Sequence, residues 1–504
     1  MEKICGYYLD QEQQKIVLDN SNYLLVTAGA GSGKTLTILG KINYLIKYKK
    51  INKKDILCIS FTKESSDSLK EKIKSEFNLD IDVYTFHKLA LKILSKNKIK
   101  YSISDSDTLD NIIHEFIYID VLNNKKYMKI ILNHFNIKYK NKKEYLKYID
   151  NNKEIYLFEK LISTFIHLFK CNGFTIKDFS TFKKKINIFN YKKEKNFLII
   201  VLNIYLKYQK YLIDNNEIDF DDMIIKATNI VDKTNLNYKY IIIDEYQDSS
   251  FVRFNLIKQI INKTNSKLMV VGDDFQSIYR FTGCDLSLFL DFNKYFNNSK
   301  ILKIQNTYRN SQELIDIAGS FIMKNKKQIK KKLKSNKHID NPINIIYYKN
   351  IKDTFIKLIN KIYNNKPIMI LGRNNNDIKY IIDNKELILK DNKIIYIKNK
   401  NIQMYYLTIH KSKGLEEENV IMINLEDKLL GFPSKIEDSK LLRFVSKNKE
   451  KYPYSEERRL LYVSLTRTKN KVYLLTPLKN ESIFVKELIK DYKNKINIKK
   501  MCYN

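Results

Sequence analysis

Residues 28–35 read Ala-Gly-Ala-Gly-Ser-Gly-Lys-Thr and separate a β-rich apolar run, Tyr23–Thr27, from a segment with helical periodicity. The glycines let the backbone curl, so that successive amide groups and the start of the helix face the oxygens of a phosphate. Lys34 can reach the β- and γ-phosphates of a nucleotide, and the hydroxyl of Thr35 can bind Mg²⁺. Ala28 stands where the strict pattern has glycine, but the strand–loop–helix context favours a phosphate-binding loop over a chance glycine-rich turn.

A phosphate-binding loop needs a carboxylate partner, and the apolar run Ile241–Ile243 ends in Asp244 and Glu245. A buried strand presents such residues at its carboxyl end, where parallel sheets bind ligands. Asp244 would order the metal shell, and Glu245 would polarise the attacking water. Two acidic residues after a strand ordinarily mark the start of a helix, but together with the loop they predict a site for ATP and Mg²⁺.

The pattern around these motifs predicts an α/β fold. Short apolar runs, each followed by a turn and by helical periodicity, are typical of a parallel sheet. They lie at Tyr23–Thr27, Ile56–Phe61, Tyr240–Asp244 and Lys267–Val271, and again at Ile343–Tyr348, Pro367–Leu371, Ile394–Ile397, Tyr405–Ile409, Asn419–Leu425 and Lys471–Thr476. Between about Lys88 and Asn216 the pattern is helical. We therefore expect one α/β unit with a helical insertion, followed by a second α/β unit.

Composition sets wider limits. A chain of 504 residues with 44% hydrophobic residues has room for two or more domains. The net charge of +35 suggests a polyanionic partner. The abundance of Lys, Asn, Ile and Tyr also fits an A/T-rich coding sequence, so the charge leaves both explanations open. The run Lys324–Lys337 holds eight lysines and predicts a solvated helix face.

The cysteines and histidines give no sign of a metal centre. Cys5, Cys58, Cys171, Cys284 and Cys502 are scattered without a C-x-x-C pair, which argues against a zinc site and a disulfide framework and favours a reducing compartment. We predict that the histidines outside the motifs are structural or exposed and lack metal-like partners; these are His114, His134, His167 and His338. The sequence has neither an apolar run of about 18 residues nor the basic and apolar start of a secretion signal, so we expect no membrane span.

Beyond Glu245 the sequence continues, and Asp244–Asp248 reads Asp-Glu-Tyr-Gln-Asp. This stretch resembles the DE-x-Q-D motif of superfamily 1 helicases of the UvrD, Rep and PcrA type. Other segments are similar to the remaining motifs of that family, in the same order; they are Leu9–Gln14, Ser60–Lys63, Thr85–His87, Val271–Phe281, Asn306–Arg309, Thr408–Glu416 and Glu456–Arg467. Phe281-Thr282-Gly283 replaces the Trp-Arg-Gly of UvrD-type enzymes, which favours the helicase IV branch.

The resemblance implies two RecA-like P-loop NTPase domains with parallel sheets. Residues 1–87 and 219–305 would form the first, residues 88–218 a helical insertion in it, and residues 306–504 the second. UvrD and Rep carry a large insertion between the positions of Arg373 and Thr408, which in this chain are only 35 positions apart. Because so few residues cannot fold a substantial domain, we expect that insertion to be absent or vestigial and the molecule to be compact and three-lobed.

The resemblance also assigns roles to single residues. Catalytic roles fall to Lys34, Glu245, Gln276, Arg309 and Arg467, and Mg²⁺ binding to Thr35 and Asp244. ATP would contact Gln13, Ala28, Gly29, Ala30, Gly31, Ser32, Gly33, Lys34, Thr35, Tyr308 and Glu416, with Gln13 reading adenine and Tyr308 stacking on it. DNA would contact Phe61, Thr85, His87, Tyr279, Phe281 and His410. Taken singly, each of these aromatic residues is also compatible with core packing, and the two histidines with packing inside their motifs. Leu36 stands where the family often has an arginine, so one adenine or ribose contact is missing.

These assignments predict an ATP-dependent DNA helicase, an ATP hydrolase that moves 3′ to 5′ on single-stranded DNA and separates duplex strands at junctions. Its setting would be DNA repair, recombination or replication, in the cytoplasm, on the nucleoid or in a virus. The alternative is a translocase that displaces proteins or RNA polymerase without processive unwinding. The sequence does not identify protein loading partners.

Overall fold

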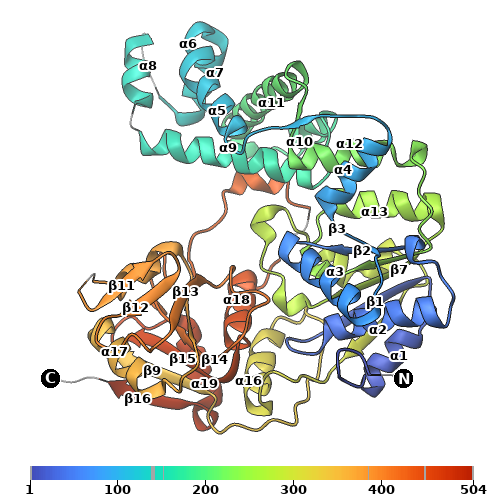
Figure 1. Cartoon of the computed structure of the whole chain (residues 1–504). Helices are drawn as coiled ribbons and strands as arrows, with labels where there is room; N and C mark the ends of the chain where they lie inside the picture. The colour runs from blue at the N-terminus through green and yellow to red at the C-terminus, as the bar shows by residue number, and fades with distance from the viewer. Residues whose placement is uncertain (1–2, 138–141, 151, 384, 448–449, 502–504) are drawn as a thin grey trace.

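The computed structural model describes residues 3–137, 142–150, 152–383, 385–447 and 450–501. Figure 1 shows two lobes built around β-sheets, with a helical lobe above them. Of the helices within the described ranges, none is long and apolar enough to cross a membrane.

The first sheet is parallel, with the strand order β3-β2-β6-β7-β1-β8. The strands are β1 (Tyr23–Ala28), β2 (Ile56–Ser60), β3 (Asp82–Thr85), β6 (Tyr240–Ile243), β7 (Lys267–Gly272) and β8 (Lys300–Ile304). The runs predicted from the sequence are the four central strands, correct to within one residue at each end. The edge strands β3 and β8 were not predicted, because their partly exposed side chains break the apolar pattern.

Helices cover both faces of this sheet. Apolar side chains of α2 (Lys34–Lys47) and α3 (Lys63–Phe77) pack on one face together with α1 (Gln11–Leu18). The other face is covered by α4 (Phe86–Lys96), α12 (Phe220–Asn229), α13 (Phe251–Thr264), α14 (Ser287–Leu290) and α15 (Phe292–Tyr295). Leu89 and Leu94 of α4 lie in this core, so the first unit extends beyond the boundary predicted at residue 88.

The helical lobe surrounds a core rich in phenylalanine, including Phe158, Phe165 and Phe197. Its helices are α5 (Thr108–Glu115), α6 (Val121–Asn123), α7 (Lys125–Phe135), α8 (Lys142–Ile149), α9 (Lys153–Cys171), α10 (Asp178–Lys184) and α11 (Tyr191–Asp214). At its base, β4 (Ser102–Ile103) pairs with β5 (Glu217–Ile218) where the chain enters and leaves the lobe.

A segment from far along the chain also enters this core. Leu441, Leu442 and Phe444 belong to η9 (Lys440–Phe444), a short 3₁₀ helix, and they are buried against the helical lobe. The side chain of Asn172 donates a hydrogen bond of 3.0 Å to the carbonyl oxygen of Val445. The helical lobe is therefore packed against both α/β units.

The second sheet has the strand order β11-β12-β13-β10-β14-β15-β9-β16. The strands are β9 (Ile343–Tyr348), β10 (Ile368–Gly372), β11 (Leu387–Lys390), β12 (Lys393–Tyr396), β13 (Met404–Thr408), β14 (Glu417–Met422), β15 (Thr468–Pro477) and β16 (Asn497–Met501). All pairs are parallel except β11–β12 and β12–β13. The helices of this unit are α16 (Gln312–Met323), α17 (Ile351–Ile362), α18 (Ser455–Leu465) and α19 (Ile483–Tyr492).

Two expectations concern the second unit. The described residues between Arg373 and Thr408 form η8 (Asn375–Tyr380) and the β11–β12 hairpin, in place of a separate domain. The prediction that Lys324–Lys337 is a solvated helix face is wrong. Helix α16 ends at Met323, and the following chain runs back to the first unit, where Lys334 exchanges backbone hydrogen bonds with residues 305 and 307.

Candidate active site

The predicted phosphate-binding loop connects the end of β1 to the start of α2. Gly33 has a φ of 75° and precedes the helix, and Gly31 has a φ of 69°. A Cβ on Gly33 would lie 2.7 Å from Nε2 of Gln13, and one on Gly31 would lie 2.4 Å from Cβ of Arg309. Only glycine fits at these positions, because the chain is left-handed there and closely packed. Ala28 is the last residue of β1 and is fully buried, so it belongs to the strand and needs no glycine.

One side of the loop carries the residues predicted to read adenine. Asp10 caps the start of α1, and Nε2 of Gln13 donates a hydrogen bond of 3.1 Å to the carbonyl oxygen of Ser32. The hydroxyl of Tyr308 donates to Oδ2 of Asp10 at 2.8 Å, while its ring remains 64% exposed. The amide of Tyr308 also donates to the carbonyl oxygen of Gly31. A free aromatic face therefore stands beside the loop.

The acidic pair lies at the carboxyl end of β6, opposite the lysine of the loop. Nζ of Lys34 is 3.3 Å from Oε1 of Glu245, and Nζ of Lys413 is 3.7 Å from Oε2 of the same residue. Although burial opposes its ionisation, the charges of the two lysines lower the pKa of Glu245 to about 2. Burial and the neighbouring charge of Glu245 raise the pKa of Asp244 to about 6. Thr35 lies in the first turn of α2, next to Lys34.

A chain of hydrogen bonds leads from Glu245 to an arginine of the second unit. Gln247 donates to Oε2 of Glu245 at 2.5 Å and accepts from the amide of Asp273 at 3.0 Å. Gln276 donates to Oδ2 of Asp273 at 2.7 Å. Nη2 of Arg467 then donates to Oε1 of Gln276 at 3.2 Å. The two units thus meet through polar side chains beside the acidic pair.

A second arginine lies close to the first. Nε of Arg309 contacts Oε2 of Glu416 at 2.5 Å, and its Nη1 donates to the carbonyl oxygen of Thr466 at 3.4 Å. Burial, with the charge of Arg309 acting in the same direction, lowers the pKa of Arg467 to about 9. The side chain therefore remains charged at neutral pH.

The residues predicted to contact DNA form two aromatic groups. In the first, the ring of Phe61 lies 5.2 Å from that of Phe86, with the guanidinium of Arg253 5.3 Å from its centre. The ring of His87 lies 5.0 Å from that of Phe220. Thr85 caps the start of α4, where its hydroxyl oxygen accepts from the amide of Lys88 at 3.2 Å; the structure thus gives this residue a local role.

The second group follows Gln276 in the chain. The hydroxyl of Tyr279 donates to the carbonyl oxygen of His410 at 2.9 Å, and the ring of Phe281 lies 5.3 Å from the His410 ring. Phe281 is 57% exposed. Burial lowers the pKa of both His87 and His410 to about 4, so these rings are neutral at physiological pH.

Sequence reasoning missed two buried lysines. Lys413 contacts Asp248 at 2.5 Å and donates to the carbonyl oxygen of Gln276 at 3.0 Å; it lies inside the predicted motif Thr408–Glu416, which was the available signal. Lys331, in the lysine-rich run, is buried against Asp273 and lies 2.6 Å from Oδ1 of Asp274. Nothing in that run distinguishes Lys331 from its exposed neighbours.

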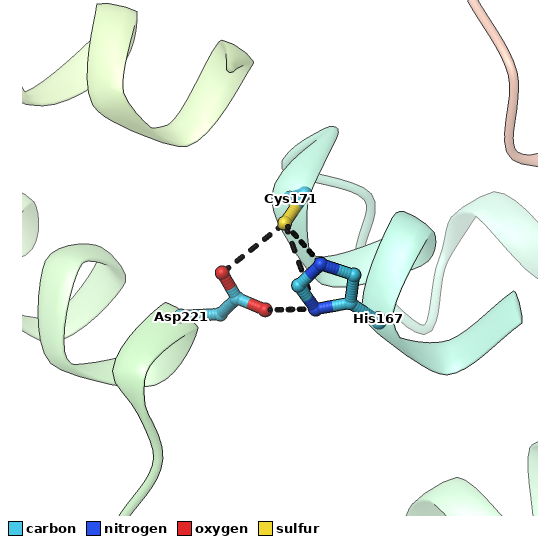
Figure 2. A group of neighbouring side chains, drawn as sticks. All are labelled: His167, Cys171 and Asp221. Atoms are coloured by element: carbon cyan, nitrogen blue, oxygen red, sulfur yellow. Dashed lines mark hydrogen bonds and ion pairs between the residues drawn. The ribbon is translucent and has the colours of Figure 1, made fainter. Parts of the chain in front are cut away.

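The prediction that His167 has no metal-like partner is also wrong. Figure 2 shows His167, Cys171 and Asp221 pointing toward one another. Two of these residues lie on α9, and the third lies in the first turn of α12. The sequence alone did not predict this group, because Asp221 is about 50 positions away from Cys171 and only the packing of α12 against α9 brings them together.

This arrangement is that of a P-loop ATPase, with the loop, the acidic pair and the two arginines gathered where the two α/β units meet. Residues 9–297 match the UvrD/REP helicase N-terminal domain. The chain therefore belongs to the UvrD/REP helicase family, and the family resemblance noted from the sequence is confirmed.

Named relatives agree with this assignment. DNA helicase IV of Escherichia coli (strain K12) is 26% identical over 501 residues, which cover 96% of this chain and 70% of the relative. The ATP-dependent DNA helicase PcrA of Bacillus subtilis (strain 168) is 28% identical over 353 residues, covering 68% of this chain and 42% of the relative. A probable DNA helicase II homolog of Mycoplasma capricolum is 31% identical over 328 residues, covering 63% and 41%. The chain thus spans less than half of the last two.

Proposed function

We propose that the protein is an ATP-dependent DNA helicase that moves 3′ to 5′ on single-stranded DNA and separates duplex strands. The observation that carries this proposal is the hydrogen-bond chain from Glu245 through Gln247, Asp273 and Gln276 to Arg467. It joins the acidic end of β6 to the second unit, and the aromatic residues of the second group follow it directly. The polarity comes from the family.

In this proposal, ATP binds between the two units. The amides of residues 28–33 and the side chain of Lys34 hold the phosphates, while Gln13 and Tyr308 hold the base. Glu416 contacts the nucleotide and keeps Arg309 in place through their ion pair. Glu245, held ionised by two lysines, accepts a proton from the attacking water.

Mg²⁺ fits the oxygen donors offered by the first turn of α2 and the end of β6. The hydroxyl of Thr35 and the carboxylate of Asp244 are the hard oxygen ligands that this ion prefers. When bound, Mg²⁺ neutralises charge on the β- and γ-phosphate oxygens. Arg309 and Arg467 place further positive charge there, and arginines in such positions contribute about 10³–10⁵ in rate.

Hydrolysis is coupled to DNA through residues that serve both sites. Gln276 faces Arg467, and Tyr279 and Phe281 follow it within five residues. Lys413 contacts Asp248 and the backbone of Gln276, while His410, three residues earlier, lies against Phe281. Movement of the second unit toward ATP therefore shifts the aromatic surface that holds the strand.

The DNA track is proposed to cross both aromatic groups. Each exposed ring offers a stacking surface that contributes about 1–3 kcal/mol per base. Phe281 is exposed, and the half-buried rings of Phe61 and His87 offer part of their surface. Arg253 adds a positive charge beside Phe61. Duplex junctions would meet this surface, and a location with access to DNA follows from the substrate: the cytoplasm, the nucleoid or a virus.

The second candidate is a translocase that displaces proteins or RNA polymerase without processive unwinding. The β11–β12 hairpin favours it, because this hairpin stands where UvrD and Rep carry a large insertion. We further propose a first RecA-like domain at residues 1–87 and 219–305, extended by α4, a helical domain in the rest of residues 88–218, and a second RecA-like domain from residue 306.

Strand displacement with ATP on 3′-tailed and 5′-tailed duplexes tests the proposal. We expect unwinding from the 3′ tail, loss of unwinding in Lys34→Ala, and normal unwinding in the control Lys54→Ala, whose side chain is exposed. Protein displacement from the same tailed DNA without strand separation would favour the translocase. Unwinding from the 5′ tail, or unchanged activity in Lys34→Ala, would contradict both.

A further inference from the structure

The group of His167, Cys171 and Asp221 lies outside the nucleotide site and has its own geometry (Figure 2). His167 and Cys171 are four residues apart on α9 and therefore share one face of that helix. Asp221 reaches them from the first turn of α12. Their donor atoms are an imidazole nitrogen, a sulfur and a carboxylate oxygen, which together form a ligand set that zinc accepts.

The distances suit a single ion. Sγ of Cys171 lies 3.2 Å from Oδ1 of Asp221 and 3.5–3.8 Å from the two ring nitrogens of His167. Nδ1 of His167 lies 3.1 Å from Oδ2 of Asp221. Zinc bonds of about 2.0–2.3 Å in a tetrahedron place neighbouring donors roughly 3.3–3.6 Å apart. These separations lie within a few tenths of an ångström of that spacing. Because Cys171 and His167 approach different carboxylate oxygens of Asp221, the carboxylate must also turn to offer one oxygen to the ion.

The surrounding charges leave Asp221 available. Lys170 is buried and forms ion pairs with Asp219 and Asp222, and so satisfies the two neighbouring carboxylates. Asp221 instead faces His167 and Cys171. Arg253 lies near the thiol of Cys171, and its positive charge disfavours binding of a cation there. Its Nη1 donates a hydrogen bond to the carbonyl oxygen of Asp248.

A backbone carbonyl group lies beside the three side chains, where a fourth ligand would be needed. The carbonyl oxygen of Thr282 lies 3.7 Å from Sγ of Cys171. A Cβ on Gly283 would lie 2.4 Å from Cβ of Cys171, so this segment is tightly packed against α9. Thr282 directly follows Phe281, the exposed ring of the second aromatic group.

We propose that His167, Cys171 and Asp221 bind one Zn²⁺ ion, with the carbonyl of Thr282 or a water molecule as the fourth ligand. The thiol of Cys171 releases its proton to solvent as the Zn–S bond forms. The ion joins the helical lobe, α12 and the segment after Phe281. It therefore braces the helical lobe against the first α/β unit, and this site does not rest on the proposed function.

The test uses the full-length chain, stripped of metal with a chelator and titrated with Co²⁺, which reports thiolate ligation by its charge-transfer absorption. We expect about one equivalent to produce this absorption and Zn²⁺ to abolish it. Cobalt at the oxygen donors of the nucleotide site gives no thiolate band. Cys171→Ser, His167→Asn and Asp221→Asn should each weaken binding at least about tenfold. The control Cys58→Ser, which alters a buried thiol in β2, should bind normally.

Thermal melting with and without Zn²⁺ separates loss of the site from loss of the fold. The proposal requires that Zn²⁺ raises the melting temperature of the unmodified chain and leaves that of His167→Asn unchanged, since this half-exposed side chain is replaced without disturbing the core. An absent thiolate band in the unmodified chain, or an equal band in Cys171→Ser, would show a hydrogen-bonded cluster that binds no metal.

Discussion

At the scale of single residues, the site depends on charges paired across the two units. Glu245 and Asp248 are both approached by Lys413, whose side chain is buried. An unpaired carboxylate in such a place gains a proton, because burial disfavours its ionised form. The ionisation of Glu245 in the first unit therefore depends in part on a lysine from the second.

Replacement of this lysine should impair hydrolysis. We expect Lys413→Met to lower DNA-stimulated ATP turnover at least about tenfold, since Glu245 loses one of two positive neighbours and Asp248 is left unpaired. The control is Lys411→Met, which changes an exposed lysine in the same motif. Equal turnover in the two variants would contradict the assignment.

Asp244 gives a prediction that depends on pH. Its pKa in the folded chain is raised from 3.8 to about 6, so the folded state keeps this proton up to a higher pH than the unfolded state does. Stability is therefore lost as the pH rises through that window. Without Mg²⁺, Asp244→Asn should match the unmodified chain at pH 4 and exceed its unfolding free energy at pH 8 by about 1–2 kcal/mol. Denaturant titrations at both pH values measure this, and a pH-independent difference would contradict it.

Phe281 is the exposed ring of the second aromatic group. Phe281→Ala should weaken binding of single-stranded DNA by about 1–3 kcal/mol, which is roughly 5- to 150-fold in Kd. Fluorescence anisotropy with a labelled oligonucleotide measures the change. The control Tyr48→Ala removes an exposed ring just beyond the end of α2. A similar change in both variants would assign the effect to the general surface.

At the scale of elements, the sequence predicted the centre of each sheet and missed its edges. The predicted strands include the four inner strands of the first sheet, whereas β3, β8, β11 and β16 lie outermost. A central strand is covered on both faces and reads as a continuous apolar run, but an edge strand carries polar side chains. The lysine-rich run was misread for a related reason, since charge alone does not show which lysine is buried.

That run gives the prediction at this scale. Lys331 neutralises Asp273 and Asp274, and Leu333 lies within 2.6 Å of where a Cβ on Gly29 would stand. Lys331→Met should lower the unfolding free energy by about 3–5 kcal/mol, because two buried carboxylates lose their partner. The control Lys332→Met changes an exposed neighbour and should be nearly neutral. Chemical denaturation that finds equal stability in the two variants would count against this role.

At the scale of the whole molecule, the three lobes are tied together by segments that cross between them. The segment of residues 305–309, which is hydrogen-bonded to Lys334, contacts the phosphate-binding loop. The 3₁₀ helix η9 packs into the core of the helical lobe. Several residues of the predicted nucleotide site lie together in the structure, among them Lys34 beside Glu245 and Gln276 beside Arg467, while their binding of a nucleotide stays a prediction. The motifs could not predict these crossing segments or the His167 group, since both depend on tertiary packing.

The central claim is that ATP drives the chain 3′ to 5′ along a single strand, whether or not it then unwinds a duplex. The most direct measurement is the arrival time at a fluorophore on the 5′ end of oligonucleotides of increasing length. We predict that the lag grows in proportion to length with ATP, and that the lag signal is absent for a 3′-end fluorophore and in Lys34→Ala. A length-dependent lag at the 3′ end, or none at either end, would contradict the account.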